Sequence, residues 1–221
     1  MNILGQANTK AVANAASNAS IEERLGFLKK VYGLLTLSLA SAVIGASLGK
    51  DLSPGLLFPL FIVEIVMIFV AMGVRRKPGL NVAALFAFTT LTGITTGPVM
   101  TLYNAAVIQE ALVLTLVIFG ALTMYVFTSK KDFSFLSGFL IVGLVAVIAG
   151  SLLNVFFFQS PMGEFVISGA GVILFSGFIL YDTSNILRNY DVEDYTSATL
   201  ALYLDLLNLF LFLLRLLNNR N

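Results

Sequence analysis

The sequence Leu202-Tyr203-Leu204-Asp205-Leu206-Leu207-Asn208 lies in the middle of the last long apolar run of the chain, from Tyr195 to Leu217. A bilayer span needs about 20 apolar residues, so this run is long enough to cross a membrane as a helix. It nevertheless carries an aspartate at its centre, where a charge is costly. The preceding apolar run ends in Tyr181-Asp182-Thr183-Ser184-Asn185, so both runs contain the pattern Asp-x-x-Asn. We therefore look for the function at these two carboxylates.

The composition predicts an all-α integral membrane protein. Hydrophobic residues make up 58% of the 221 residues and charged residues 11%, which is too apolar for one soluble core. The net charge of +1 offers no basic field for nucleic acid, so the expected partner is the lipid bilayer and not nucleic acid. Histidine and cysteine are absent, which excludes disulfides, Ser-His-Asp triads and the usual zinc sites. Any response to pH near neutral then falls to a carboxylate, and no tightly bound cofactor is expected.

The lengths of the apolar runs predict seven membrane spans in one compact domain, residues 25–221. The expected spans are residues 31–49, 55–74, 80–100, 107–127, 135–157, 163–187 and 195–217. Residues 1–24 are expected to form a flexible cytoplasmic tail. Near its end, Ser20-Ile21-Glu22-Glu23 fits a capping box, which predicts that a helix begins at Ile21.

Lysine and arginine in the connections predict the orientation, because they favour the cytoplasmic side. They precede the first span and follow the second, fourth and sixth, as Arg24, Lys29, Lys30, Arg75, Arg76, Lys77, Lys130, Lys131 and Arg188. The alternate connections carry only Lys50, although Arg220 lies near the C-terminus. We therefore expect a cytoplasmic N-terminus and a C-terminus outside.

Small residues indicate where helices approach closely. Gly45 and Gly49 lie on the first span and Gly93 and Gly97 on the third, and glycines in membrane helices permit close backbone contact. The third span also contains Pro98, which frees a backbone carbonyl. We expect this helix to bend or to line a cavity.

Four of the ionisable residues inside the predicted spans are candidates for a functional or structural role, and none of them should face lipid. They are Glu64, Asp182, Asp205 and Arg215. Arg75 follows Glu64 by eleven residues, about three helical turns, and so continues its face. Glu64 and Arg215 are expected to form a structural or outer-gate ion pair.

Each aspartate has an asparagine three residues later, Asn185 after Asp182 and Asn208 after Asp205, which places an amide on the same helix face. A cluster of such oxygen atoms suits a hard cation such as Ca²⁺. It also suits a proton switch, because two neighbouring carboxyl groups can share one proton. Arg75 is the alternative partner of Asp182, which gives a gate that is closed when protonated and open when bridged by arginine. A purely structural role, as polar contacts between helices, remains the competing interpretation.

The chain resembles the transmembrane Bax-inhibitor-motif family. The resemblance rests on Leu180-Tyr181-Asp182-Thr183-Ser184-Asn185-Ile186 and on the residues from Ala201 to Leu217, and it covers about residues 25–217. Gly97-Pro98 and Lys131-Asp132-Phe133-Ser134-Phe135-Leu136 are similar to the bacterial YccA-like branch.

The resemblance implies a bundle of six helices around a central seventh, the C-terminal one. It also implies a pH-sensitive calcium leak with Asp182 and Asp205 as sensor, Arg75 as the alternative partner of Asp182, and a further contact between Glu64 and Arg215. The YccA-like branch implies instead a partner and modulator of the membrane AAA protease FtsH, engaged through the N-terminal tail. Both roles imply a multi-pass protein of the bacterial inner membrane.

Catalysis is the third hypothesis, since two aspartates on neighbouring spans also occur in intramembrane aspartyl proteases. The second aspartate of those enzymes lies in Gly-x-Gly-Asp, which brings substrate backbone close. Here the sequence is Tyr203-Leu204-Asp205, so we do not expect an enzyme.

Overall fold

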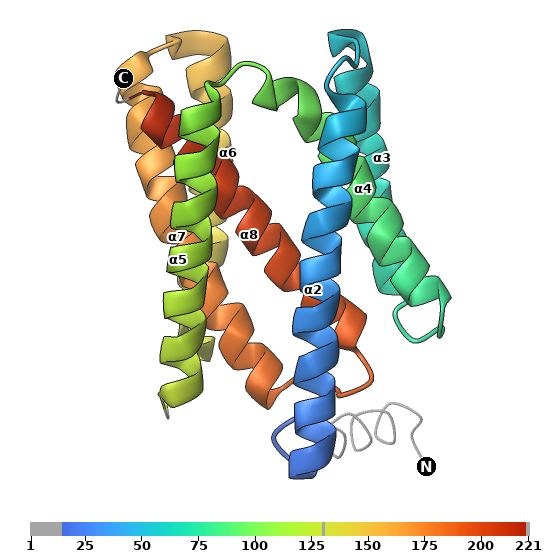
Figure 1. Cartoon of the computed structure of the whole chain (residues 1–221). Coiled ribbons are helices and arrows are strands. Elements are labelled where there is room, and N and C mark those ends of the chain that lie inside the picture. The colour runs from blue at the N-terminus through green and yellow to red at the C-terminus, as the bar shows by residue number, and fades with distance from the viewer. Residues whose placement is uncertain (1–14, 130, 220–221) are drawn as a thin grey trace, which may run out of the picture. The chain divides into compact units, whose positions relative to one another are not determined.

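The computed structural model describes residues 15–129 and 131–219, and these are almost entirely helical (Figure 1). Seven helices among them are long and apolar enough to cross a membrane. They are α2 (Ile21–Gly49), α3 (Leu57–Gly73) after the short η1 (Pro54–Leu56), α4 (Leu80–Met100), α5 (Ala105–Thr128), α6 (Ser137–Leu153) between η2 (Ser134–Leu136) and η3 (Asn154–Phe158), α7 (Pro161–Arg188) and α8 (Tyr195–Asn218). The predicted seven-helix membrane fold is confirmed, and the third predicted span coincides with α4.

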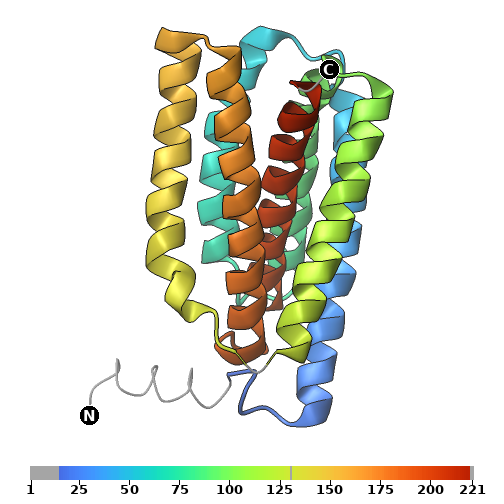
Figure 2. The ribbon, with the colours of Figure 1, turned by 90° about the vertical axis from the view of Figure 1, so that its left-hand side faces the viewer.

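The chain divides into two compact units. Unit 1 runs to Leu102 and includes Ile186–Tyr203, whereas unit 2 comprises Tyr103–Asn185 and the chain from Leu204 onward. Unit 1 therefore contains α2, α3, α4 and the start of α8. Unit 2 contains α5, α6, most of α7 and the remainder of α8, and Figure 2 shows α6, α7 and α8 of this unit running side by side.

The first helix begins where the capping box predicts. The backbone N–H of Glu23 donates to Ser20 Oγ at 3.2 Å, and the N–H of Ser20 donates to Glu23 Oε2 at 2.9 Å. These bonds satisfy two backbone groups that the first turn leaves without partners. The chain before this helix contacts the turn between α7 and α8, since the N–H of Ala16 donates to the carbonyl of Tyr190 at 2.9 Å. Residues 1–14 of the expected tail lie outside the described residues.

Glycines bring α2 and α4 into close contact within unit 1. The hydrogen of each glycine that a Cβ would replace points at a carbonyl oxygen of the facing helix. The pairs are Gly45 with Thr90, Gly49 with Ile94, Gly93 with Ala42 and Gly97 with Ala46. Contacts of the type Cα–H···O=C recur at helix interfaces that small residues permit. The predicted packing role of these glycines is confirmed.

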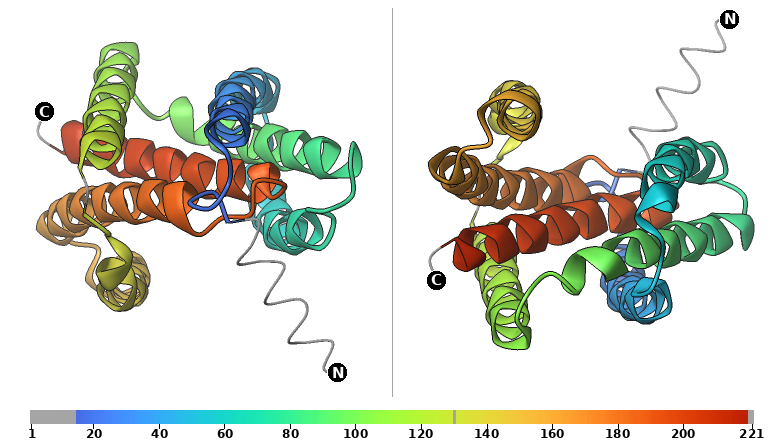
Figure 3. Two further views of the ribbon diagram at one scale, coloured as in Figure 1. Left: turned by 90° about the horizontal axis from the view of Figure 1, so that it is seen from below. Right: turned by 90° about the horizontal axis from the view of Figure 1, so that it is seen from above.

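Pro98 lies inside α4, and the helix continues past it to Met100. Proline has no N–H, so it cannot bond the carbonyl of Ile94 four residues earlier. That carbonyl is the one covered by Gly49 of α2. The neighbouring helix therefore accommodates the freed group, and Figure 3 shows α2 and α4 close together from both ends.

The C-terminal helix α8 is the most buried of the seven. Buried residues make up 56% of its most apolar stretch, against 33% or less in each other helix. The opposite case is α3, where the share is 6% and Phe58, Phe61 and Phe69 are exposed. Large exposed apolar side chains of this kind are expected to contact lipid. The burial of α8 is what a central helix requires.

Candidate functional site

The two aspartates singled out in the sequence meet within unit 2. Asp182 of α7 and Asp205 of α8 are joined by a side-chain hydrogen bond. Only 4% of Asp205 is exposed to solvent. An ionised carboxylate accepts hydrogen bonds but donates none, so a bond between two carboxyl groups requires a proton on one of them.

One oxygen of the pair remains without a hydrogen-bond partner. Oδ2 of Asp205 is buried, and no described residue donates to it. A buried polar atom without a partner costs about 1–3 kcal/mol, so the helix accepts a penalty at this point. Such an atom is available to a second proton, a water molecule or a cation.

The residues next to Asp182 attach α7 to the start of the α6 segment. Thr183 and Ser184 are fully buried, and Ser184 Oγ accepts a hydrogen bond from the backbone N–H of Phe133 at 3.2 Å. This bond joins α7 to the segment that precedes η2.

The two asparagines differ in their surroundings. Nδ2 of Asn208 donates to the carbonyl of Leu204 at 2.8 Å, so its amide is used on its own helix. Asn185 lies half-buried one turn after Asp182. Among the described residues, no cluster of three or more His, Cys, Asp or Glu side chains surrounds a metal position. The first ligands for Ca²⁺ would be Asp182 and Asp205, and the remaining oxygens would come from backbone or water.

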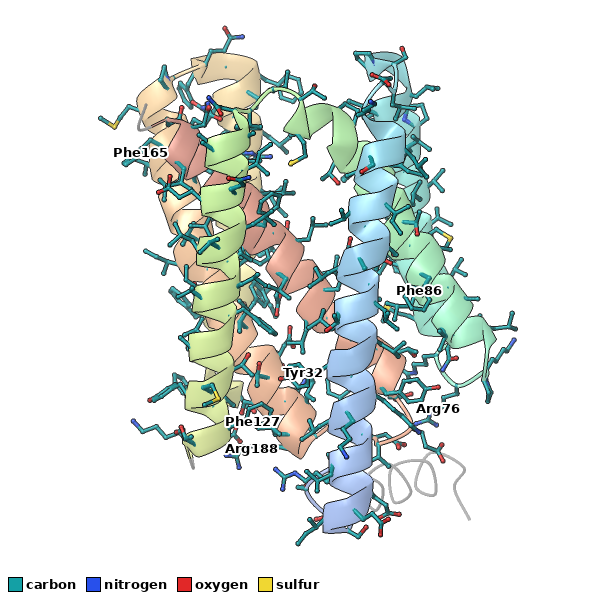
Figure 4. The ribbon with its side chains drawn as sticks, viewed as in Figure 1. Tyr32, Arg76, Phe86, Phe127, Phe165 and Arg188 are labelled. Carbon is teal, nitrogen blue, oxygen red and sulfur yellow. The ribbon has the colours of Figure 1, made fainter. Side chains whose placement is uncertain are left out.

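In the structure Arg75 contacts Asp194, and its pairing with Asp182 stays a prediction for a second state. Its Nε lies 3.9 Å from Asp194 Oδ1, within unit 1. The adjacent Arg76 contacts Asp191 at 3.3 Å and Asp194 at 3.7 Å. Figure 4 shows Arg76 at the end of α3, beside the turn that leads into α8. Two arginines therefore hold the acidic turn before the helix that carries Asp205.

Glu64 accepts a hydrogen bond from Thr95 of α4, within unit 1. The threonine belongs to a polar stretch before Pro98 that contains Thr92, Thr95 and Thr96. Thr92 of the same stretch bonds the hydroxyl of the fully buried Tyr203. The hydroxyls of α4 thus supply polar partners in the interior of unit 1.

Arg215 lies in unit 2, where it contacts Tyr103 and Phe212. Its guanidinium forms a hydrogen bond with the side chain of Tyr103 and lies 5.6 Å from the centre of the Phe212 ring. Burial raises the pKa of Tyr103, while the charge of Arg215 opposes that rise and the charge of Glu164 adds to it. Glu64 and Arg215 therefore each have a contact within their own unit.

Three functional contacts were not anticipated from the sequence: Asp194 with Arg75, Thr95 with Glu64, and Tyr103 with Arg215. One signal was present for the first of them. Asp191 and Asp194 lie three residues apart in the connection before the last span, so this connection is acidic. The only two adjacent arginines in the sequence are Arg75 and Arg76. Opposite charges at the ends of neighbouring spans pair readily.

Comparison with known proteins finds relatives along nearly the whole chain. The family described as "Inhibitor of apoptosis-promoting Bax1" matches residues 24–221. The chain is 37% identical to Bax inhibitor 1 of Schizosaccharomyces pombe, over 97% of this chain and 84% of that protein. It is 36% identical to an uncharacterized protein of Helicobacter pylori, over 98% and 96%. It is 32% identical to Protein lifeguard 4 of Mus musculus, over 94% and 91%.

Proposed function

Because the chain belongs to the transmembrane Bax-inhibitor-motif family, we propose that it is a proton-gated cation leak that passes Ca²⁺, with Asp182 and Asp205 as the gate. The observation that carries this proposal is the direct hydrogen bond between these two carboxyl groups. Intramembrane ionisable groups commonly mark ion pathways and proton relays.

The proton decides which state the gate adopts. With one shared proton, the pair carries at most a single negative charge and links α7 to α8. Loss of that proton leaves two carboxylates side by side, which repel strongly in a medium of low dielectric constant. The helices then separate at this point, and the two carboxylates become oxygen ligands for Ca²⁺. The leak is therefore closed at low pH and opens as the pH rises.

Arg75 is the proposed partner of Asp182 in the open state. To reach it, Arg75 must leave Asp194, which it contacts at 3.9 Å with 45% of its side chain exposed. Ion pairs as exposed as this contribute about 0–1 kcal/mol. The exchange of partners by Arg75 therefore costs little free energy. The proposed supporting polar residues are Asn185, Asn208, Glu64 and Arg215.

Ca²⁺ flux in liposomes tests this proposal. The wild-type protein, reconstituted with a trapped Ca²⁺ indicator, is expected to show flux that increases with pH. Asp205→Asn cannot lose a proton in this range, so its flux should no longer depend on pH. The matched control is Asp51→Asn, an exposed aspartate at the end of α2, which should behave as the wild type. A pH dependence that survives in Asp205→Asn contradicts the gate.

The second candidate function is modulation of the membrane protease FtsH, as in the YccA-like branch. The stretch from Lys131 to Leu136 supports this candidate, because it resembles that branch. The Helicobacter pylori protein is a bacterial relative that matches nearly the whole of both chains. We place the protein in the bacterial inner membrane, with the N-terminus in the cytoplasm, where such a protease would engage the tail.

Deletion of residues 1–14 tests this second function without disturbing the start of α2, because the contact of Ala16 with Tyr190 and the capping box remain. The protein should co-purify with the protease from native membranes, and the shortened chain should not. Equal co-purification of both chains excludes the tail as the region of contact, and absence of association for the full chain excludes the function itself.

A further inference from the structure

A pocket in unit 2 lies where three spans end. It has a volume of about 510 Å³, within the range of about 300–1,000 Å³ typical of ligand sites. Its wall comes from the end of α6, the turn into α7, the start of α7 and the last turns of α8. Because these are the ends of membrane spans, the pocket lies at the depth of the lipid headgroups.

The pocket contains one negative and one positive side chain from different helices. Glu164 is in the first turn of α7, and Arg215 is in the last part of α8. The described residues show no ion pair within 4.0 Å between these two side chains. Glu164 and Arg215 line one pocket without forming an ion pair with each other. A zwitterionic ligand could therefore pair its cation with Glu164 and its anion with Arg215.

The rim of the pocket is a rigid turn. Asn154 bonds Ser160 twice, with Nδ2 donating to the Ser160 carbonyl at 3.2 Å and Oδ1 accepting from the Ser160 N–H at 3.1 Å. Between them, Gln159 has a left-handed backbone with φ of 46°, and its N–H donates to the Asn154 carbonyl at 2.6 Å. A non-glycine residue with positive φ costs free energy and persists where its surroundings fix it. The turn thus presents polar side chains at a fixed position.

The surroundings of the pocket favour a lipid over a water-soluble ligand. Leu152, Val155, Phe156 and Ile167 form its apolar wall. Next to it, Phe156, Phe157 and Phe158 are 69%, 76% and 70% exposed. Three adjacent exposed phenylalanines at the end of a span are suited to contact acyl chains.

We propose that this pocket binds the headgroup of a zwitterionic phospholipid, with Arg215 holding the phosphate and Glu164 holding a primary ammonium. Guanidinium binds phosphate through two parallel N–H···O bonds. Arg215 has donors free for this, since one hydrogen bond to Tyr103 engages a small part of its five N–H groups. The carboxylate of Glu164 accepts hydrogen bonds from an ammonium with N–H groups, which a trimethylammonium headgroup lacks.

Lipid retention measured by native mass spectrometry tests the proposal. The full-length protein is equilibrated in mixed micelles with equal amounts of phosphatidylethanolamine, phosphatidylcholine and phosphatidylglycerol. The wild type should retain the ethanolamine lipid about tenfold over the choline lipid, the ratio expected from one hydrogen bond to a charged group. Equal retention of all three lipids overturns the proposal.

Variants separate the two charges. Glu164→Gln should lower retention of the ethanolamine lipid to that of the choline lipid and leave the glycerol lipid unchanged. Arg215→Lys, which keeps the charge but loses the paired bonds, should lower retention of all three. Glu110→Gln, an exposed glutamate of α5 outside the pocket, is the control and should behave as the wild type. An ethanolamine preference that survives in Glu164→Gln overturns the assignment.

Free phosphoethanolamine distinguishes a lipid from a soluble zwitterion. It should displace the bound lipid only weakly, because the apolar wall contributes nothing to its binding. Displacement at concentrations comparable with those of the lipid would assign the pocket to a soluble molecule and overturn the lipid proposal.

Discussion

The side chain of Asp205 combines burial with an unsatisfied oxygen, and each of these costs folding free energy. It lies in the most buried helix, 4% of it is exposed, and one of its oxygens has no hydrogen-bond partner among the described residues. Its other oxygen is in a position to take part in the side-chain hydrogen bond with Asp182. A site of this kind is a poor source of stability, because two apolar residues would pack at lower cost.

Tyr103 reports on the charges at the other end of unit 2. Burial and Glu164 raise its pKa, and Arg215 lowers it. We therefore expect Arg215→Gln to raise the pKa of Tyr103 further and Glu164→Gln to lower it. A titration of the ring Cζ signal by NMR, in protein labelled at tyrosine, measures both shifts. Shifts of the same sign in the two variants would contradict this arrangement of charges.

The same group predicts how stability depends on alkaline pH. An unfolded tyrosine loses its proton at about pH 10, whereas burial makes folded Tyr103 retain it to higher pH. The unfolded chain therefore binds fewer protons than the folded chain above about pH 10. The contribution of Tyr103 to the free energy of unfolding is fully present below that pH and decreases as the pH rises. Phenylalanine has no phenolic proton to lose. Tyr103→Phe should therefore reduce the loss of thermal stability between about pH 9 and 11, the range around the tyrosine pKa.

Among the elements, the contact of α2 with α4 depends on the absence of side chains. A Cβ at Gly45 would collide with the backbone carbonyl of Thr90, whereas a Cβ at Gly33 of the same helix meets nothing within 4 Å. Gly45→Ala should therefore destabilise the protein by about 1–3 kcal/mol, the usual cost of overpacking. Gly33→Ala should be neutral or stabilising by up to about 1 kcal/mol, since alanine favours the helix. Unfolding in detergent with increasing SDS measures both, and equal effects would contradict the close approach.

The turn between α7 and α8 is held by charges from α3. Arg76 contacts Asp191 at 3.3 Å, and the side-chain exposures are 58% and 9%. We expect Arg76→Gln and Asp191→Asn to be non-additive, with a coupling free energy of about 0.2–1 kcal/mol for a pair this exposed. A double-mutant cycle of stability measures the coupling, and 1 M salt should reduce it. Additive effects at low salt would show that the pair contributes nothing.

At the scale of the whole molecule, the proposed orientation can be tested with single cysteines, because the natural chain contains none. Ser17 precedes α2 and Ser53 follows it, and both are exposed. In intact cells, a membrane-impermeant thiol reagent should label Ser53→Cys and should label Ser17→Cys only after lysis. Labelling in the reverse order would invert the orientation and place the N-terminus outside.

The sequence by itself determined the helices, their order and the chemistry inside them. A run of apolar residues long enough to cross a bilayer must satisfy its backbone internally, so length and composition suffice to predict α3 through α8. The start of α2 followed from Ser20 and Glu23, because a capping box acts between residues three apart. The two carboxylates, the interface glycines and the freed carbonyl before Pro98 were likewise visible as residue types at particular depths.

Only the tertiary structure decided which of these groups meet. The contact of Asp182 with Asp205 depends on how α7 and α8 pack against each other, which neither helix specifies by itself. The partners of Arg75, Glu64 and Arg215 are Asp194, Thr95 and Tyr103, and the sequence carries a signal for the first of these contacts alone. A long charged side chain reaches several neighbours at similar cost, so its partner depends on how the helices pack and not on its own position in the chain.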